Sequence, residues 1–193
     1  MDYEQMSLIP ITLFGDKILR KKVAKVTEIN GNTIRIISDM FDTMRNAKGI
    51  GLAANQVGVN QQIFVVDLSS VEDYESYKPI ALINPKITAK SDEENVIEEG
   101  CLSIPELRAE IVRPEMINIS YFDTDMKEHT IEADELFARV MLHEYDHLQG
   151  VLFIDYFDEE MKKKSKKHLT KIKKRKLEID YPVSDNVDYT LIK

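Results

Sequence analysis

The segment His143-Glu144-Tyr145-Asp146-His147 constrains this chain more than any other stretch of its sequence. Two histidines at positions i and i+4 of an α-helix differ by about 40° around its axis, so both imidazoles can bind one ion. Glu144 then lies beside that ion, where a carboxylate can accept the proton of a bound water. The motif predicts a helical metal site of the hydrolytic type, with an ordinary solvated helix face as the alternative.

The residues around the motif indicate that this helix packs into a core. Leu136 and Val140 precede the histidines at helical spacing and form one stripe with them. Asp134 favours the start of a helix and Gly150 favours its end. We therefore expect a helix from about residue 134 to 149, with the histidines at the edge of its apolar face.

Hydrolytic zinc sites take three protein ligands, so one more ligand must come from elsewhere in the chain. A metzincin protease would need a histidine where this chain has Phe153. A thermolysin-like enzyme would use a glutamate about twenty residues downstream, in a region that is rich in lysine here, and Glu159 and Glu160 lie close to the helix. The remaining candidate is Cys101, the only cysteine, because a thiolate binds zinc or ferrous iron well. Its alternative role is that of a small core residue.

Two further segments carry groups that suit this chemistry. In residues 99–103, Gly100 allows close approach of the backbone to an ion, and the Leu102 N–H can donate to a developing oxyanion. In residues 49–56, Gln56 offers an amide donor to a carbonyl group. That glycine-containing segment lacks both the third glycine of a dinucleotide loop and the Gly-Lys-Ser/Thr of a nucleotide loop, which argues against nucleotide binding.

Together these segments resemble the peptide deformylases, which remove the N-formyl group from nascent bacterial proteins. That family carries Gly-apolar-Gly-apolar-Ala-Ala-x-Gln, then Glu-Gly-Cys-Leu-Ser, then His-Glu-x-x-Asp-His-Leu. This chain has the three motifs in the same order at residues 49–56, 99–103 and 143–148. Weaker similarity extends from about residue 10 to about residue 160. The resemblance implies a metal-dependent hydrolase that releases formate from N-terminal formyl-methionine.

The resemblance also implies the metal ligands and their neighbours. Cys101, His143 and His147 would hold one divalent ion, with water as the fourth ligand. The ion in the family is natively ferrous iron, and zinc, nickel and cobalt are alternatives that the ligand set does not separate. Glu144 would act as the proton carrier. Gln56 and the Leu102 N–H would stabilise the oxyanion.

An apolar pocket should receive the methionine side chain of the substrate. Its expected walls, each of which could instead be ordinary core, are Ile50, Leu102, Leu136 and Val140. The resemblance places Arg108 near the start of the bound peptide, with a surface ion pair as the alternative, and gives Glu99 and Gly51 as partners for the peptide backbone. Arg139 lies one turn before His143, so we expect a more polar rim to the pocket than is usual in the family.

The pattern of apolar residues predicts an α+β fold in which the metal-binding helix packs against antiparallel or mixed sheets. We expect helices near residues 31–47, 134–149 and 158–178, strands near 62–68, 80–89 and 116–122, and an exposed loop at 69–79. Residues 1–160 would form a deformylase-like catalytic domain, and residues 161–193 a basic helix and tail that pack on this domain or extend from it. No role is predicted for residues 179–193.

Composition agrees with a soluble, single-domain enzyme, which we expect to be a monomer in the bacterial cytoplasm. The chain has 193 residues, 43% of them hydrophobic, and no apolar run long enough for a membrane span. A single cysteine excludes an internal disulfide. Asp2 and Glu4 disfavour a secretory signal or an organellar transit peptide.

Charge is distributed unevenly. Residues 161–176 contain ten Lys or Arg and no acidic residue, whereas the rest of the chain has 16 basic and 34 acidic residues. This segment is either a solvated helix attracted to its own acidic domain or, by analogy with similar deformylases, a dock for ribosomal RNA. Binding of the second kind would depend strongly on salt.

Two other classes of function remain open from the sequence. A metalloprotease would cleave unformylated proteins and should tolerate Cys101→Ala better than a deformylase does. A structural metal-binding module would bind the ion without turnover, and would need neither Glu144 nor Gln56.

Overall fold

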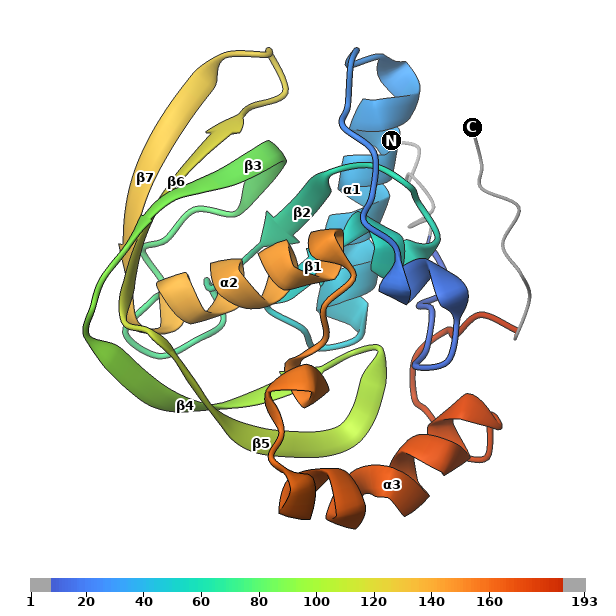
Figure 1. Ribbon diagram of the computed structural model, residues 1–193. Coiled ribbons are helices and arrows are strands. Elements are labelled where there is room, and N and C mark those ends of the chain that lie inside the picture. Colours follow the sequence, from blue (N-terminus) through green and yellow to red (C-terminus); the bar gives the residue numbers. More distant parts are fainter. Residues whose placement is uncertain (1–7, 186–193) are drawn as a thin grey trace.

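The computed structural model describes residues 8–185. This part of the chain forms a five-stranded sheet, a two-stranded hairpin and three α-helices (Figure 1). The α-helices are α1 (Gly31–Asn46), α2 (Glu135–Gln149) and α3 (Glu159–Lys173). The strands are β1 (Gly51–Ala53), β2 (Ile63–Val66), β3 (Ile80–Lys90), β4 (Glu94–Cys101), β5 (Ile104–Pro114), β6 (Met116–Phe122) and β7 (Glu128–Asp134). Short 3-10 helices occupy Lys17–Arg20, Ala54–Val57 and Phe153–Tyr156.

The larger sheet is antiparallel throughout, with the strand order β1-β2-β3-β6-β7. All four residues of β2 are buried. Ile63 and Val65 join an apolar cluster with α1, while Phe64 and Val66 join another with α2. Successive side chains of a strand point to opposite faces, so a continuous apolar run is what a strand covered on both sides requires.

Helix α2 lies between the five-stranded sheet and the β4–β5 hairpin (Figure 1). Residues such as Ala138, Met141 and Leu148 pack it against the sheet. The hairpin covers its other side, and β4 ends at Cys101 close to the helix. This arrangement brings a residue from a strand terminus to the middle of a buried helix.

The fold class predicted from the sequence is confirmed, and so are the helices near 31–47 and 134–149. The strand at 116–122 is observed as predicted, the strands near 62–68 and 80–89 are observed at 63–66 and 80–90, and no helix or strand interrupts residues 69–79. The sequence analysis missed β1, β4, β5 and β7. In β4 and β5 the charged Glu99 and Arg113 are buried while Val96 and Val112 are exposed, so the alternation of apolar and polar residues that marks a half-buried strand is broken.

The C-terminal helix is shorter than predicted. Helix α3 ends at Lys173 instead of residue 178. Arg175 adopts a left-handed φ of 52°, which turns the chain out of the helix. Leu177 and Ile179 then pack on an apolar cluster that also contains Phe153 and residues of β5. Burial of these side chains outweighs the helical preference of the lysine-rich sequence before them.

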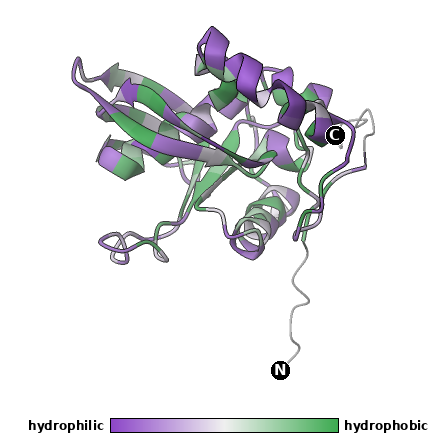
Figure 2. Cartoon of the chain, turned by 90° about the horizontal axis from the view of Figure 1, so that it is seen from below, coloured by the Kyte–Doolittle hydropathy of each residue, from purple (hydrophilic) through white to green (hydrophobic). Residues whose placement is uncertain are grey.

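No α-helix within residues 8–185 is long and apolar enough to cross a membrane. Helix α3 is coloured as mostly hydrophilic, whereas green and purple residues alternate along the strands (Figure 2).

The division of the chain near residue 160 remains a prediction. Ile172 of α3 is fully buried in the same apolar cluster as Ile104 and Ile111 of β5.

Gly150→Ala should lower the free energy of unfolding by about 1–2 kcal/mol or more, because an L-residue is strained in the left-handed region. Gly150 ends α2 with a φ of +78°, and an added Cβ would lie 2.8 Å from the backbone carbonyl of Arg20. Urea unfolding of the two proteins measures the difference.

Gly31→Ala is the matched control. Gly31 begins α1 with negative φ, and an added Cβ would meet no heavy atom within 4 Å. This change should be neutral or should stabilise the protein by up to about 1 kcal/mol. Equal effects at the two positions would contradict the argument from backbone conformation.

Candidate metal centre and active site

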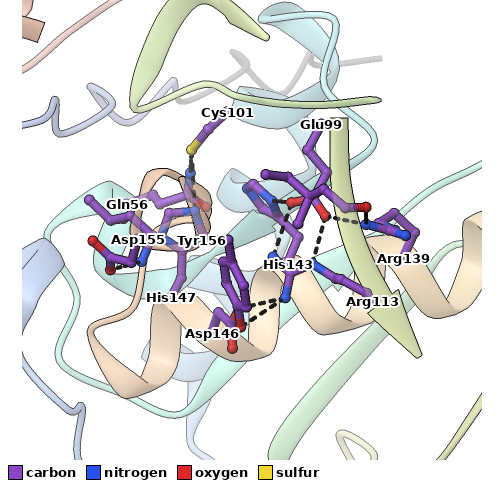
Figure 3. Close-up of polar contacts among 12 residues, drawn as sticks. Gln56, Glu99, Cys101, Arg113, Arg139, His143, Asp146, His147, Asp155 and Tyr156 are labelled. Carbon is purple, nitrogen blue, oxygen red and sulfur yellow. Dashed lines mark hydrogen bonds and ion pairs between the residues drawn. The ribbon is translucent and has the colours of Figure 1, made fainter. Parts of the chain in front are cut away.

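Three potential metal ligands converge from two elements. Cys101 comes from the end of β4, and His143 and His147 come from successive turns of α2 (Figure 3). Their ligand atoms all lie within 4.8 Å of one another, and the Cys101 Sγ is 3.2 Å from the His147 Nε2. The two histidines are buried. This is the set of ligands that the sequence analysis expected.

The chemistry of this donor set fits a divalent transition metal. One thiol and two imidazoles match zinc and ferrous iron, and three protein ligands leave a position for water or substrate. Burial lowers the pKa of His143, but Cys101 and Glu99 beside it raise that pKa well above its ordinary value. Burial and the charge of His143 lower the pKa of His147 well below its ordinary value, which keeps a nitrogen of that ring unprotonated and available to a metal.

The buried carboxylate of Glu99 orients the first histidine (Figure 3). It accepts a hydrogen bond from the His143 Nδ1 at 2.8 Å, which leaves the Nε2 of that ring for a metal. The Arg113 guanidinium donates to both of its oxygens, at 2.6 and 3.0 Å, and the Arg139 Nη1 donates at 2.8 Å. Burial raises the pKa of Glu99, but the hydrogen bonds from His143 and Arg113 and the charge of Arg113 hold it well below the ordinary value. Glu99 is therefore an anchor that is ionised at neutral pH.

Arg113 connects this anchor to the rest of α2. Its Nη1 donates to the Asp146 Oδ2 at 2.6 Å, and its guanidinium lies 4.5 Å from the centre of the Tyr156 ring. The Tyr156 hydroxyl also donates to the Asp146 Oδ2, at 2.8 Å. β5, α2 and the 3-10 helix after α2 are thereby joined by one network of charged hydrogen bonds.

Arg139 lines the cavity, but it is buried and so adds little exposed polar surface to the rim that we expected from the sequence. Its side chain is 3% exposed, and its donors point to Glu99, the Ile111 carbonyl and the Asn95 carbonyl. A buried guanidinium needs such acceptors, and the hairpin carbonyls supply them. Arg139 therefore fixes the hairpin against α2.

Glu144 is buried at the edge of the cavity beside the three ligands. Its Oε2 has no hydrogen-bond partner among the described residues. Burial raises the pKa of Glu144 to about 7. A Cβ on Gly51 would lie 2.5 Å from the Glu144 Oε1, so this position of β1 has no space for a larger residue. The carboxylate can thus exchange a proton near neutral pH.

The Gln56 amide is fixed in one orientation. Its Oε1 accepts from the Ala53 N–H at 2.7 Å, so its Nε2 must face the other way. That Nε2 lies 3.2 Å from the Ser103 Oγ and 3.5 Å from the Cys101 Sγ. A donor that is held in this way next to the ligands can interact with a developing oxyanion.

A cavity of about 510 Å³ opens beside these groups. The residues that the sequence analysis assigned to substrate binding all line it, namely Ile50, Gly51, Glu99, Leu102, Arg108, Leu136 and Val140. Within the cavity, Arg108 has a 69% exposed side chain and lies 3.5 Å from Glu98, and the Glu99 carboxylate is already occupied by Arg113, Arg139 and His143.

Comparison with known proteins identifies the family. The model of the polypeptide deformylase family matches residues 8–163. The chain belongs to this family. It is 40% identical over 177 residues to a peptide deformylase of Chlorobaculum parvum, covering 92% of this chain and 94% of the relative. It is 44% identical over 176 residues to one of Cytophaga hutchinsonii, covering 90% of this chain and 95% of the relative.

Solved deformylase structures share the fold. A crystal structure of a peptide deformylase from Synechococcus elongatus in complex with actinonin has a TM-score of 0.77 at 40% identity, and the match covers 85% of this chain and 89% of that one. A plant peptide deformylase has a TM-score of 0.82 at 36% identity, with coverage of 90% and 94%. The resemblance inferred from three short motifs is therefore confirmed over most of this deformylase.

The sequence analysis missed several residues that hold the deformylase site together. Asn55 donates to the His147 carbonyl at 2.6 Å and so ties the glycine-containing segment to α2. Arg113 lies in a strand that was not predicted. It is 14 residues after Glu99, a separation that does not by itself indicate a contact. No local pattern indicates such pairs, because pairing along β4 and β5 brings them together.

Glu99→Gln should destabilise the deformylase by about 3–5 kcal/mol, since it leaves the buried Arg139 without a counter-charge and Arg113 with Asp146 alone. It should also weaken metal binding roughly 10–100-fold through the lost support of His143. Urea unfolding and competition of the zinc-loaded protein with a chelator measure these effects. Glu98→Gln is the control, because its exposed pair with Arg108 should contribute less than about 1 kcal/mol.

Acid should remove the contribution of Glu99. Its pKa in the folded protein lies well below the ordinary value of 4.5, so its stabilising effect is present above that value and is lost as the pH falls through the folded pKa. In the metal-free protein, the free energy of unfolding should therefore decline below a pH of about 4.5, and Glu99→Gln should flatten this decline. An unchanged slope would contradict the assignment.

Proposed function

We propose that Glu144, Gln56 and the Leu102 N–H carry out the reaction by which this peptide deformylase removes the formyl group from N-terminal formyl-methionine. One observation carries the proposal. The buried Glu144 carboxylate, which has an oxygen without a partner among the described residues, lies beside Cys101 and the two histidines at an open cavity.

Cys101, His143 and His147 would hold one divalent ion, which we propose to be Fe²⁺, with Zn²⁺, Ni²⁺ and Co²⁺ as alternatives. Such an ion, when bound, makes water a nucleophile near neutral pH and polarises the carbonyl that is attacked. The distances support this set, because its ligand atoms lie within 4.8 Å of one another.

Glu144 would carry the proton through the reaction. A pKa of about 7 allows it to take a proton from the attacking water and to return it to the leaving amine nitrogen. Water thus adds to the formyl carbon and the C–N bond breaks. Formate and a free amino terminus result. Its buried position keeps other proton donors away from the carboxylate.

Gln56 and Leu102 would stabilise the oxygen that gains negative charge. The Gln56 Nε2 is directed toward Cys101, and Leu102 directly follows that ligand at the turn between β4 and β5. Donors fixed before the reaction need no reorganisation in the transition state, and loss of one typically costs about 3 kcal/mol in the barrier.

The substrate would bind as an extended chain along β1. This strand is at the edge of the sheet, and its residue Gly51 lines the cavity, so the backbone can pair with a peptide. Ile50, Leu102, Leu136 and Val140 would surround the methionine side chain. Arg108 would contact the peptide from the cavity mouth, and Glu99 would contribute through its backbone.

Formate release from a formyl-methionyl peptide tests this function, with anaerobically purified protein reloaded with ferrous iron. Glu144→Ala should reduce kcat/KM by about 10²–10⁴-fold while metal binding persists, because a general acid–base group contributes that much. Glu132→Ala changes an exposed glutamate of β7 and is the control. Full activity of Glu144→Ala, or cleavage of unformylated peptides only, would overturn the proposal in favour of another role or a protease.

We further propose that the enzyme works as a monomer in the bacterial cytoplasm and that residues 161–176 bind ribosomal RNA. Lysines of α3 and of the turn after it line one shallow surface, namely Lys163, Lys166, Lys167, Lys171, Lys174 and Lys176. A surface with several ammonium groups and no carboxylate attracts phosphates.

Lys166→Glu combined with Lys167→Glu should weaken co-sedimentation with ribosomes, and wild-type binding should fall steeply as salt is raised. The same double exchange at exposed Lys86 and Lys90 of β3 provides a control of equal charge. Equal binding of both variants would show that the lysines of α3 only solvate the helix.

A further inference from the structure

The chain returns to the active site after α3. Residues 177–184, which we call the return segment, include the part for which the sequence predicted no role. Glu178, Ile179, Asp180 and Tyr181 line the same cavity as Cys101 and Glu144. The return segment is therefore a component of the site.

Hydrogen bonds and apolar contacts fix the return segment in place. Ile11 donates its N–H to the Pro182 carbonyl and accepts from the Ser184 N–H, both at 2.9 Å. The Ser184 Oγ donates to the Asp16 Oδ2 at 3.0 Å, and Arg175 donates to the same carboxylate at 2.7 and 2.8 Å. Ser184 and Asp16 are buried. Such anchors at its C-terminal end allow the segment to hold a neighbouring group in a defined position.

Tyr181 connects this segment to the turn at residues 101–103, which we call the catalytic turn. Its hydroxyl donates to the Leu102 carbonyl at 2.7 Å, although the two residues are 79 positions apart. Burial raises the pKa of Tyr181, so the hydroxyl keeps its proton and remains a donor at neutral pH. Ser103, the next residue of the turn, is fully buried and accepts through its carbonyl from the Phe14 N–H at 2.8 Å.

The geometry of the peptide relates this contact to the reaction. The Leu102 N–H belongs to the peptide group that joins Cys101 to Leu102. The Leu102 carbonyl belongs to the peptide group that joins Leu102 to Ser103. A metal ligand on one side and a held carbonyl on the other restrict both backbone dihedrals of Leu102. An oxyanion donor is effective only when its direction is set before the reaction. A hydrogen bond to the carbonyl thus sets the direction of the N–H.

We propose that Tyr181 is a positioning residue of the deformylase, whose hydroxyl fixes the turn at Leu102 and thereby aims the Leu102 N–H at the developing oxyanion. The inference rests on the role of Leu102 in the proposed function. It assigns a part in the reaction to a segment beyond residue 163, where the match to the family model ends.

Tyr181→Phe tests the inference, because it removes the hydroxyl and keeps the ring. We expect kcat for formate release to fall about tenfold, a part of the 10²–10³-fold that loss of a whole donor costs, while KM and the melting temperature stay unchanged. Tyr74→Phe is the matched control. Its hydroxyl donates to the Glu135 Oε2 at 3.2 Å and does not line the cavity, so its loss should change none of the three quantities.

A second measurement does not depend on activity. In zinc-loaded, ¹⁵N-labelled protein, hydrogen exchange of the Leu102 amide should become faster in Tyr181→Phe and stay unchanged in Tyr74→Phe. Wild-type kcat in Tyr181→Phe, or a lower melting temperature with kcat unchanged, would overturn the positioning role. Absence of formate release by the wild type would overturn the proposed function itself. Wild-type activity with an unaffected Tyr181→Phe would overturn only the inference.

Discussion

The buried carboxylate of Glu99 is the contact on which the site depends. It receives hydrogen bonds from His143 and Arg139 of α2 and from Arg113 of β5. Two guanidinium groups in the interior are tolerable only beside such an anion. The same interaction orients an imidazole and attaches β4 to α2, so the position of Cys101 relative to the histidines follows from it.

Helix α2 can carry this chemistry because both of its sides are covered. The five-stranded sheet buries its apolar stripe, and the hairpin closes over the side that bears the histidines (Figure 1). Burial raises the pKa of two acids in this region, and their partners decide the net shift. Glu99 keeps its charge because charged donors surround it, whereas the Ala53 N–H and the neighbouring charges do not offset burial at Glu144, whose pKa rises to about 7. One carboxylate is thus an anchor, and the other has the properties that the proposed proton carrier needs.

The catalytic turn at residues 101–103 is held from several distant parts of the chain. Gln56 contacts it from the segment after β1, Phe14 from the N-terminal region, and Tyr181 from the return segment. A two-residue connection between strands has little stability by itself. Contacts from three directions give it the rigidity that a site for a metal and an oxyanion requires.

The sequence by itself determined the family and the fold class, and it supplied the ligand set and the proton carrier that we propose. These follow from short motifs in which the spacing of residues has a direct geometric meaning, as with two histidines one turn apart. The weakly patterned strands β1, β4, β5 and β7, the end of α3 at Lys173 and the partners of Glu99 were not found. Only the tertiary structure decided that Arg139 is buried beside Glu99 and that Tyr181 reaches Leu102. Such contacts join residues that are far apart in the chain, and they depend on the packing of whole elements, which no local spacing encodes.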